Sequence, residues 1–277
     1  MGDIMRPVPF EALLTRIFDE YQNHRSIFGI PEQQFYSPAS PNRLTVFGES
    51  CATPVGPAAG PHTQLAQNII TSWLTGGRFI ELKTVQILDR LELEKPCIDA
   101  EDECFNTEWS TEFTLKKAAD EYLKAWFILH LLEEIFPLTP MKGGKSFIFN
   151  MSVGYNLDGI KQPPMQEFIN NTINSSKHPK FAEYVRILQK WVNDEDFIKS
   201  MGLESRKARL QSLPSRISPE LVHGVTLSTM HGCPPDEIEK ICQYMLEEKS
   251  LNTFVKLNPT LFWPTPISSE SWRSEEH

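Results

Sequence analysis

The stretch from Cys51 to Gln86 constrains the fold of this 277-residue chain more than any other. It begins with a short apolar run that ends in the small residues Ala58, Ala59 and Gly60. A pattern with helical spacing follows and stops at a glycine pair, after which the run F-I-E-L-K-T-V alternates apolar and polar residues. This order predicts a strand, a helix and a second strand, which is the βαβ unit of parallel sheets.

The same alternation continues to about residue 260. Apolar runs predict later strands at 147–153, 223–227 and 253–257, and helices at 112–136, 165–201 (two helices) and 235–249. Strands that alternate with helices five times match the beginning of a (β/α)8 barrel. We therefore predict an α/β fold, an incomplete TIM barrel of about five of the eight βα units.

The chain divides into three predicted regions. A helix at 10–21 and a short strand or hairpin at 44–47 predict an N-terminal extension over residues 1–50. The partial barrel occupies 51–260. Residues 261–277 combine prolines and serines without helical or strand periodicity, so we expect an unstructured tail, as at a truncated or shifted reading frame or an artificial boundary.

Composition excludes several functions. The formal net charge of −9 argues against nucleic acid or an anionic membrane as a partner. No apolar run approaches the ~20 residues of a membrane span, and the first residues lack the apolar core of a secretory signal. We expect a cytoplasmic protein.

The cysteines and histidines predict no metal site. The five cysteines are scattered and form no C-x-x-C pair, whereas an iron–sulfur cluster needs about four thiolates, usually closely spaced. His231 lies near Cys233, and Cys97 and Cys104 flank acidic residues, but neither group has the second half that a zinc site requires.

A lysine and a threonine end the second predicted strand. Parallel α/β folds place ligands at the carboxyl ends of their strands. At that position Lys83 can neutralise an anionic ligand and the Thr84 hydroxyl can hydrogen-bond it, while residues as small as 58–60 let a flat ligand approach the backbone. A plain glycine turn beside an ordinary strand lysine explains the pattern equally well.

Several motifs carry a resemblance to known families. V-G-P-A-A-G followed by F-I-E-L-K-T resembles the flavin-binding start of the dihydroorotate dehydrogenase family and of the flavin domain of dihydropyrimidine dehydrogenase. The runs C-I-D-A-E-D-E-C-F-N-T-E-W-S, F-N-M-S-V-G-Y-N and T-L-S-T-M-H-G-C-P-P more closely resemble the amino-terminal part of selenate reductase-type iron–sulfur flavoproteins of enteric bacteria. The resemblance extends from residue 1 to about Pro259. It implies FMN as the cofactor, with any cluster ligands of the relatives outside this chain.

The resemblance also implies which residues bind the flavin. Residues 58–60 match the segment that faces the isoalloxazine ring, and Lys83 and Thr84 match the lysine and hydroxyl that follow the second strand. Lys256 matches a lysine near the N1–O2 edge. Reduced flavin is negative at N1, and a fixed cation there stabilises it. The alternative for Lys256 is a strand residue whose charged end reaches solvent.

Three asparagines complete the implied site. Asn106 matches a loop asparagine that binds a planar amide substrate, and Asn150 and Asn156 lie where flavin-contacting amides occur, near the end of the third strand. An amide both donates and accepts hydrogen bonds, as pyrimidine-like or flavin edges require. The alternative is turn chemistry, which asparagine favours.

Cys233 matches the position of a catalytic base. In class 1 dihydroorotate dehydrogenases a cysteine follows the same strand, but here Thr226 replaces the family's asparagine and about four extra residues precede the cysteine. A thiolate base needs a nearby cation or helix N-terminus, which His231 or the helix start after Cys233 would supply. A structural cysteine in a tight turn is equally compatible, and the substrate cannot be carried over.

We therefore expect the flavin domain of a larger iron–sulfur oxidoreductase, which passes electrons between a small-molecule substrate and other redox subunits or domains. One alternative is a truncated, non-catalytic remnant or a partner-binding piece. Another is a barrel enzyme that uses Lys83 or Lys256 as a Schiff-base lysine. Barrel phosphate sites are commonly built by the loops after strands seven and eight, and the predicted partial barrel lacks those strands. The isolated chain is therefore expected to hold no stoichiometric FMN.

Overall fold

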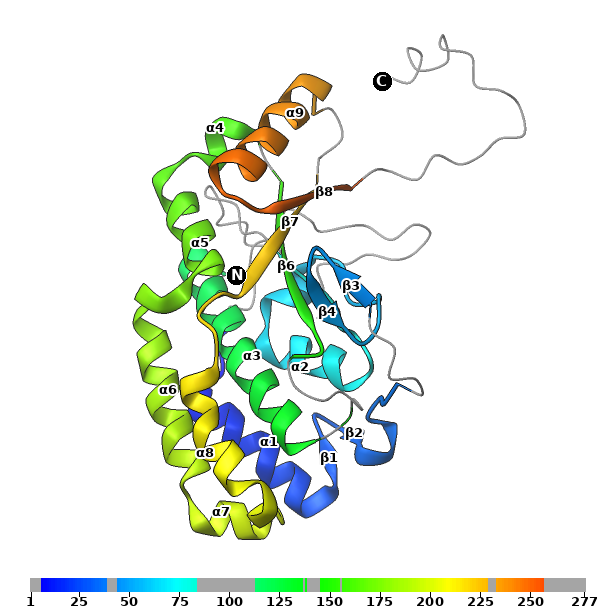
Figure 1. The fold of residues 1–277 in the computed structure, drawn as a ribbon, viewed down its shortest axis with the longest axis vertical. Helices are drawn as coiled ribbons and strands as arrows, with labels where there is room; N and C mark the ends of the chain where they lie inside the picture. Colours follow the sequence, from blue (N-terminus) through cyan, green and yellow to red (C-terminus); the bar gives the residue numbers. More distant parts are fainter. Residues whose placement is uncertain are drawn as a thin grey trace, which may run out of the picture.

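A computed structural model describes residues 6–38, 44–83, 113–136, 138, 145–154, 156–228 and 233–256. The largest sheet of this part of the chain has the strand order β5-β6-β7-β8, all parallel (Figure 1). Its strands are β5 (Phe79–Leu82), β6 (Ile148–Val153), β7 (Val222–Ser228) and β8 (Asn252–Lys256). The four later predicted strands are confirmed to within a few residues.

Helices connect these strands, as parallel pairing requires. They are α2 (Ala66–Leu74) before β5, α3 (Leu115–Ile135) before β6, then α4 (Leu157–Ile160), α5 (Pro163–Ile173), α6 (Pro179–Val192), α7 (Glu195–Ser200) and α8 (Lys207–Arg216) before β7, and α9 (Pro235–Gln243) with the π-helical turn η5 (Tyr244–Glu248) before β8. The sequence did not predict α8, because it contains a proline and few apolar residues. No helix in the described residues is long and apolar enough to cross a membrane.

Two small antiparallel hairpins and a helix precede the sheet. The helix is α1 (Phe10–His24), and the hairpins pair β1 (Ser26–Ile27) with β2 (Ile30–Pro31) and β3 (Leu44–Val46) with β4 (Glu49–Cys51). Short 3-10 turns lie at η1 (Glu32–Gln34), η2 (Pro61–Gln64), η3 (Ser175–Lys177) and η4 (Glu204–Arg206). The predicted helix and hairpin of the N-terminal extension are confirmed.

The outer face of the sheet is apolar and carries the helices. Phe149, Met151 and Val225 are fully buried on this face. The Trp126 ring of α3 lies 5.2 Å from the Phe149 ring, and the Thr172 hydroxyl of α5 lies 3.3 Å from the Met151 sulfur. Burying one such side chain contributes about 1.5–3 kcal/mol, so this layer fixes the sheet against α3 and α5.

The N-terminal helix belongs to the same hydrophobic core. Phe10 of α1 lies 4.3 Å from the Tyr184 ring of α6 and 6.2 Å from the Phe127 ring of α3, and Phe18 packs 4.8 Å from Phe197 of α7. Helices α1, α3, α6, α7 and α8 thus form a helical layer that continues the core beyond the amino ends of the strands (Figure 1).

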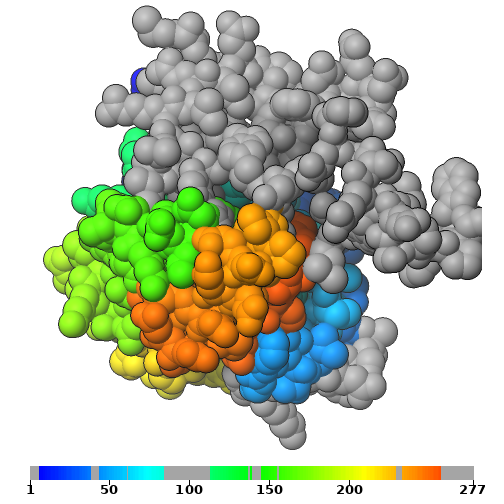
Figure 2. Space-filling view, turned by 90° about the horizontal axis from the view of Figure 1, so that it is seen from above, coloured from blue at the N-terminus to red at the C-terminus, as the bar shows by residue number. Residues whose placement is uncertain are grey.

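The sheet is strongly curled. The rings of Phe79 on β5 and Phe254 on β8 lie 5.9 Å apart although two strands separate them. In a flat sheet the first and fourth strands would be roughly 14 Å apart. The inner face is therefore concave, as in a barrel wall, and the Phe47 ring of the β3–β4 hairpin closes over it at 4.9 Å from Phe254. Figure 2 shows this hairpin in blue beside the orange β8 and α9 segment.

The first predicted strand differs from its prediction. Cys51 ends an antiparallel hairpin, and residues 52–60 form no regular strand. The carbonyls of Val55 and Pro57 nevertheless accept hydrogen bonds from amides of β5 at 3.1 Å each, in parallel order. Because Pro54 and Pro57 have no N–H to donate, this segment follows the edge of β5 without completing a ladder.

Candidate functional site

Polar side chains gather on the concave inner face near the carboxyl ends of the strands. Glu81 and Lys83 come from β5 and the residue after it, Asn150 from β6, Thr226 from β7 and Lys256 from β8. Strand register places Glu81 beside Asn150, and the curl brings β8 across to β5. Three of the predicted cofactor residues, Lys83, Asn150 and Lys256, therefore lie on one surface.

A carboxylate links the two sides of this surface. The Glu81 carboxylate accepts a hydrogen bond from the Ala59 backbone N–H at 2.8 Å. The same oxygen lies 3.9 Å from the Lys256 ammonium nitrogen. The segment of small residues, β5 and β8 are thus joined at one point. Sequence reasoning missed Glu81, because an ordinary polar residue is also expected at this position of an alternating strand. Only its place two residues before Lys83 indicated a role.

The amide of Asn150 is held in place by its neighbours. Its nitrogen donates to the Thr226 hydroxyl at 2.6 Å, and the side chain is almost fully buried. A Cβ added at Gly224 would lie 2.6 Å from the Asn150 oxygen, so only glycine leaves room for it. Thr226, which replaces the family's asparagine, here positions another asparagine.

Lys83 is buried at the end of β5, and its backbone carbonyl accepts a hydrogen bond from the Tyr122 hydroxyl of α3. A buried lysine is uncommon in proteins and is usually paired. The anchor to α3 fixes the backbone from which this side chain extends.

The small-residue segment is held by buried polar groups. The Gly60 N–H meets the Thr63 hydroxyl at 3.2 Å, and the Ala66 N–H at the start of α2 donates to the Glu121 carboxylate at 2.9 Å. Glu121 is ion-paired with Lys124, and both are almost fully buried. Nearby, the buried Gln64 amide has no hydrogen-bond partner for either polar atom within the described part of the chain.

Two other predicted residues have local structural roles. The exposed Asn156 accepts a hydrogen bond from the Gly159 N–H at 2.8 Å and so caps α4, which is the turn chemistry named as its alternative. Cys233 precedes α9, but partial burial and the nearby Glu237 carboxylate raise the pKa of its thiol. The lowered pKa that a thiolate base needs is therefore not found with the groups described around it. Thr84, Asn106 and His231 lie outside the described residues.

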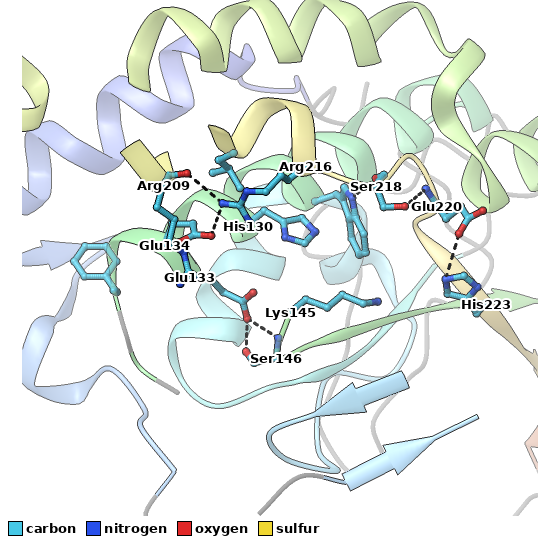
Figure 3. Close-up of a pocket in the computed structure, with 13 residues that line it drawn as sticks. His130, Glu133, Glu134, Lys145, Ser146, Arg209, Arg216, Ser218, Glu220 and His223 are labelled. Carbon is cyan, nitrogen blue, oxygen red and sulfur yellow. Dashed lines mark hydrogen bonds and ion pairs between the residues drawn. The ribbon is translucent and has the colours of Figure 1, made fainter. Parts of the chain in front are cut away.

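A separate polar cavity of about 300 Å³ lies at the opposite, amino-terminal end of the sheet (Figure 3). Its walls come from the last turns of α3, from α8, and from the residues around the starts of β6 and β7. Glu134 binds both Arg209 and Arg216, and Glu133 accepts hydrogen bonds from the backbone and hydroxyl of Ser146.

Burial perturbs the titratable groups of this cavity. It raises the pKa of Glu133 to about 7 and lowers the pKa of His130 to about 3, with Lys145 and Arg216 lowering the latter further. The Nε2 atom of His130 is buried and has no hydrogen-bond partner in the described ranges. Perturbed pKa values and a cavity are features of active sites, but paired structural groups show them too. Because barrel chemistry is found at the carboxyl ends of the strands, we place the candidate site there.

The donor set at the carboxyl ends fits a flat, anionic cofactor. The segment 58–60 carries no bulky side chain of its own, although the His62 imidazole lies against Gly60 and hydrogen-bonds the Ala58 backbone. Two lysines supply positive charge on the same concave face. The Asn150 amide, fixed by Thr226, adds a hydrogen-bonding group. Within the described residues, no group of three or more His, Cys, Asp or Glu side chains is arranged to hold a metal ion.

Fold and site together define an α/β domain of the barrel class, with its polar groups at the carboxyl ends of a curled parallel sheet. Residues 28–269 match the family described as "Oxidoreductase YgfK, N-terminal TIM-barrel domain", and the chain belongs to this family. The resemblance indicated by the motifs is confirmed at this level.

Two relatives carry the name "Putative oxidoreductase YgfK", one from Escherichia coli strain K12 and one from Escherichia coli O157:H7. Each is 76% identical over 261 residues, which are 94% of this chain and 25% of the relative. The chain thus spans about a quarter of the length of these curated relatives. No solved structure matches it.

Proposed function

We propose that this chain is the FMN-binding domain of an oxidoreductase. The observation that carries the proposal is the convergence of the small-residue segment, Lys83 and Lys256 on one concave surface at the carboxyl ends of the strands. Bound FMN would accept or give up electrons in exchange with a small-molecule substrate. The family's oxidoreductase description supports the reaction class.

Each group of the surface has a distinct task in this proposal. The segment 58–60 supports the flat ring through its backbone, and the Asn150 amide hydrogen-bonds a polar edge. Lys83 and Lys256 favour an anionic ring over a neutral one. Thr84 and Asn156 are proposed as further hydrogen-bonding groups, and Asn106 as a contact to the substrate. Cys233 is proposed as a base only if an unassigned cation offsets its raised pKa.

The electrons would continue to other redox domains or subunits, for which iron–sulfur clusters are the proposed carriers. We expect the ligands of such clusters outside this chain, because its five cysteines are scattered and form no C-x-x-C pair.

The test uses a chimera in which this chain replaces the matching quarter of the Escherichia coli relative. FMN is identified by absorption spectrum and by mass after release from the protein. Lys256→Met is expected to lower the flavin reduction potential, because the reduced anion loses a cation. Lys145→Met is the matched control, since Lys145 also pairs with a glutamate, Glu49, but at the other end of the sheet. A purified chimera without flavin, or an unchanged potential in Lys256→Met, contradicts the proposal.

A further inference from the structure

The Glu81 carboxylate occupies the centre of the candidate site. Its side chain is only 12% exposed, and one of its oxygens meets both the Ala59 N–H and the Lys256 ammonium. A buried carboxylate is costly unless it is paired, and here two partners from different elements satisfy it. Removing the side chain would leave both partners without this contact.

The position of Glu81 matters because of the curl of the sheet. Glu81 and Lys256 come from the first and fourth strands of the order β5-β6-β7-β8, so their contact crosses the concave inner face. Any flat ligand on segment 58–60 lies beside this contact, because the Ala59 backbone is bound to the same oxygen. The ligand therefore meets a carboxylate together with the lysine that pairs with it.

We infer that Glu81 is a positioning residue that lowers the reduction potential of the flavin by holding Lys256 and by opposing negative charge on the reduced ring. This inference rests on the proposed function. Two-electron reduction adds two electrons and one proton to FMN and leaves a negative charge at N1. A cation shared with a carboxylate stabilises that charge less than a free cation does, and the carboxylate itself repels it.

A purely structural role for Glu81 makes a different prediction. The hydrogen bond to Ala59 needs an acceptor oxygen but no charge, so glutamine preserves it whereas alanine does not. The pairing with Lys256 needs the charge. Comparing Glu81→Gln with Glu81→Ala therefore separates support of the segment from control of the potential.

The experiment measures FMN content, FMN affinity and flavin reduction potential in the chimera described above. Reduction with dithionite is followed against reference dyes. Glu81→Gln is expected to raise the potential, with at least a tenfold gain in relative binding of the reduced flavin, which is about 30 mV for a two-electron couple. Glu81→Ala is expected to weaken FMN binding as well, because Ala59 loses its anchor.

Glu49→Gln is the matched control, since Glu49 is 14% exposed and pairs with Lys145 at the amino-terminal end. Its potential is expected to equal that of the parent. The double variant Glu81→Gln, Lys256→Met removes both charges of the pair, so it remains informative if Glu81→Gln does not fold. Its potential is expected to lie above that of Lys256→Met alone.

The outcomes distinguish the two proposals. A parent chimera without FMN overturns the proposed function, and this inference with it. A parent that binds FMN while neither Glu81→Gln nor the double variant shifts the potential relative to its own reference overturns this inference alone. A shift of the same size in Glu49→Gln also overturns it, because the effect would then not be local.

Discussion

The two ends of the sheet are built from similar side chains but organised differently. At the amino-terminal end, Glu134 binds two arginines and Lys145 binds Glu49 around a cavity, so most charges are paired with near neighbours. At the carboxyl end, Glu81 joins a backbone amide to a lysine from a distant strand. The amino-terminal end is thus a network of ion pairs around a cavity, whereas the carboxyl end brings together polar groups from several strands.

A cavity and shifted pKa values, two common indicators of function, mark the end of the sheet opposite to the candidate site. The cavity and two strongly perturbed titratable groups, Glu133 and His130, both lie at the amino-terminal end. Glu133 and His130 belong to α3, and the desolvation of their side chains explains both pKa shifts without a ligand. The carboxyl end is less conspicuous, but there the fold gathers groups from several strands, which is how barrel sites are assembled.

The largest expected effect comes from the ion pair that supports the carboxyl end. Glu121→Ala leaves the buried Lys124 charge without its carboxylate, with the Val8 carbonyl as its remaining acceptor among the described residues, and removes the acceptor for the first amide of α2. Breaking a buried pair in this way costs about 3–5 kcal/mol, so urea unfolding is expected to show a loss of that size. Glu183→Ala is the control, because Glu183 pairs with Lys180 at the same helical spacing but both side chains are 39% exposed. A loss below 1 kcal/mol in Glu121→Ala would show that the pair does not support this end.

The amino-terminal network is expected to respond to pH. The pKa of Glu133 is about 7 when folded and near 4.5 when unfolded, so its contribution to stability falls as pH rises through that window. The pKa of His130 is about 3 when folded and near 6.5 when unfolded, so its contribution falls as pH drops below 6.5. The two slopes oppose each other where the windows overlap.

Single replacements are expected to separate these slopes. Between pH 4.5 and 6.5, Glu133→Gln leaves the slope of His130, and stability rises with pH by about 1 kcal/mol per unit relative to the parent. His130→Gln leaves the slope of Glu133 and gives the opposite sign. Urea midpoints across pH measure both. Parallel curves for the two variants would show that neither group is buried as described.

A smaller loss of stability is expected from a substitution in the segment 52–60, which follows the edge of β5. A Cβ at Gly56 would lie 1.7 Å from the Phe79 carbonyl oxygen, so Gly56→Ala must displace the segment. Overpacking of this kind costs about 1–3 kcal/mol, and we expect weaker FMN binding with it, because residues 58–60 follow directly. Gly202→Ala is the control: its positive φ of 65° strains the substitution, but no atom lies within 4 Å. Gly202→Ala is expected to lose stability without loss of FMN affinity. Equal FMN affinities in the two variants would show that Gly56 does not support the site.

The smallest expected effect tests Asn156. The α4 cap uses only the side-chain oxygen, which leaves the amide nitrogen able to donate to a ligand. Asn156→Ser keeps a capping oxygen and removes that donor, so stability should change by less than about 0.5 kcal/mol. If the nitrogen contacts FMN, affinity falls about 2- to 10-fold, the value of one hydrogen bond. An unchanged Kd would leave Asn156 as a cap alone.

Sequence pattern predicted most of the regular elements. The apolar runs that became β6 and β7 are buried on the helix-covered face, whereas β8 is only partly buried and its Val255 is exposed. The helical spacing of α3 reflects the same burial. The pattern failed where local chemistry and tertiary contacts disagree. Residues 52–60 look apolar enough for a strand, but prolines interrupt the ladder, and α8 forms despite Pro214 because Leu210 and Leu213 are buried in the core.

The candidate site was predictable only in part. Lys83 was predicted from its place at a strand end in a parallel fold, and the resemblance added Asn150 and Lys256. The register places all three on one face of the sheet, and their roles stay predictions. Glu81 was not found, because its role depends on a lysine 175 positions later in the chain. The cap at Asn156 was foreseen as an alternative, since asparagine has only a few local uses and the sequence shows the following turn.

The parallel βαβ order, the apolar positions along the strands and the family could all be read from the residues alone, because they follow from local periodicity and from specific residue runs. Which charges meet depends instead on the folded chain. The curl of the sheet brings β8 across to β5, so Lys256 reaches Glu81, and the packing of α3 and α8 desolvates Glu133 and His130. Distances between non-neighbouring strands and the depth of burial depend on the whole fold, and no local pattern encodes them.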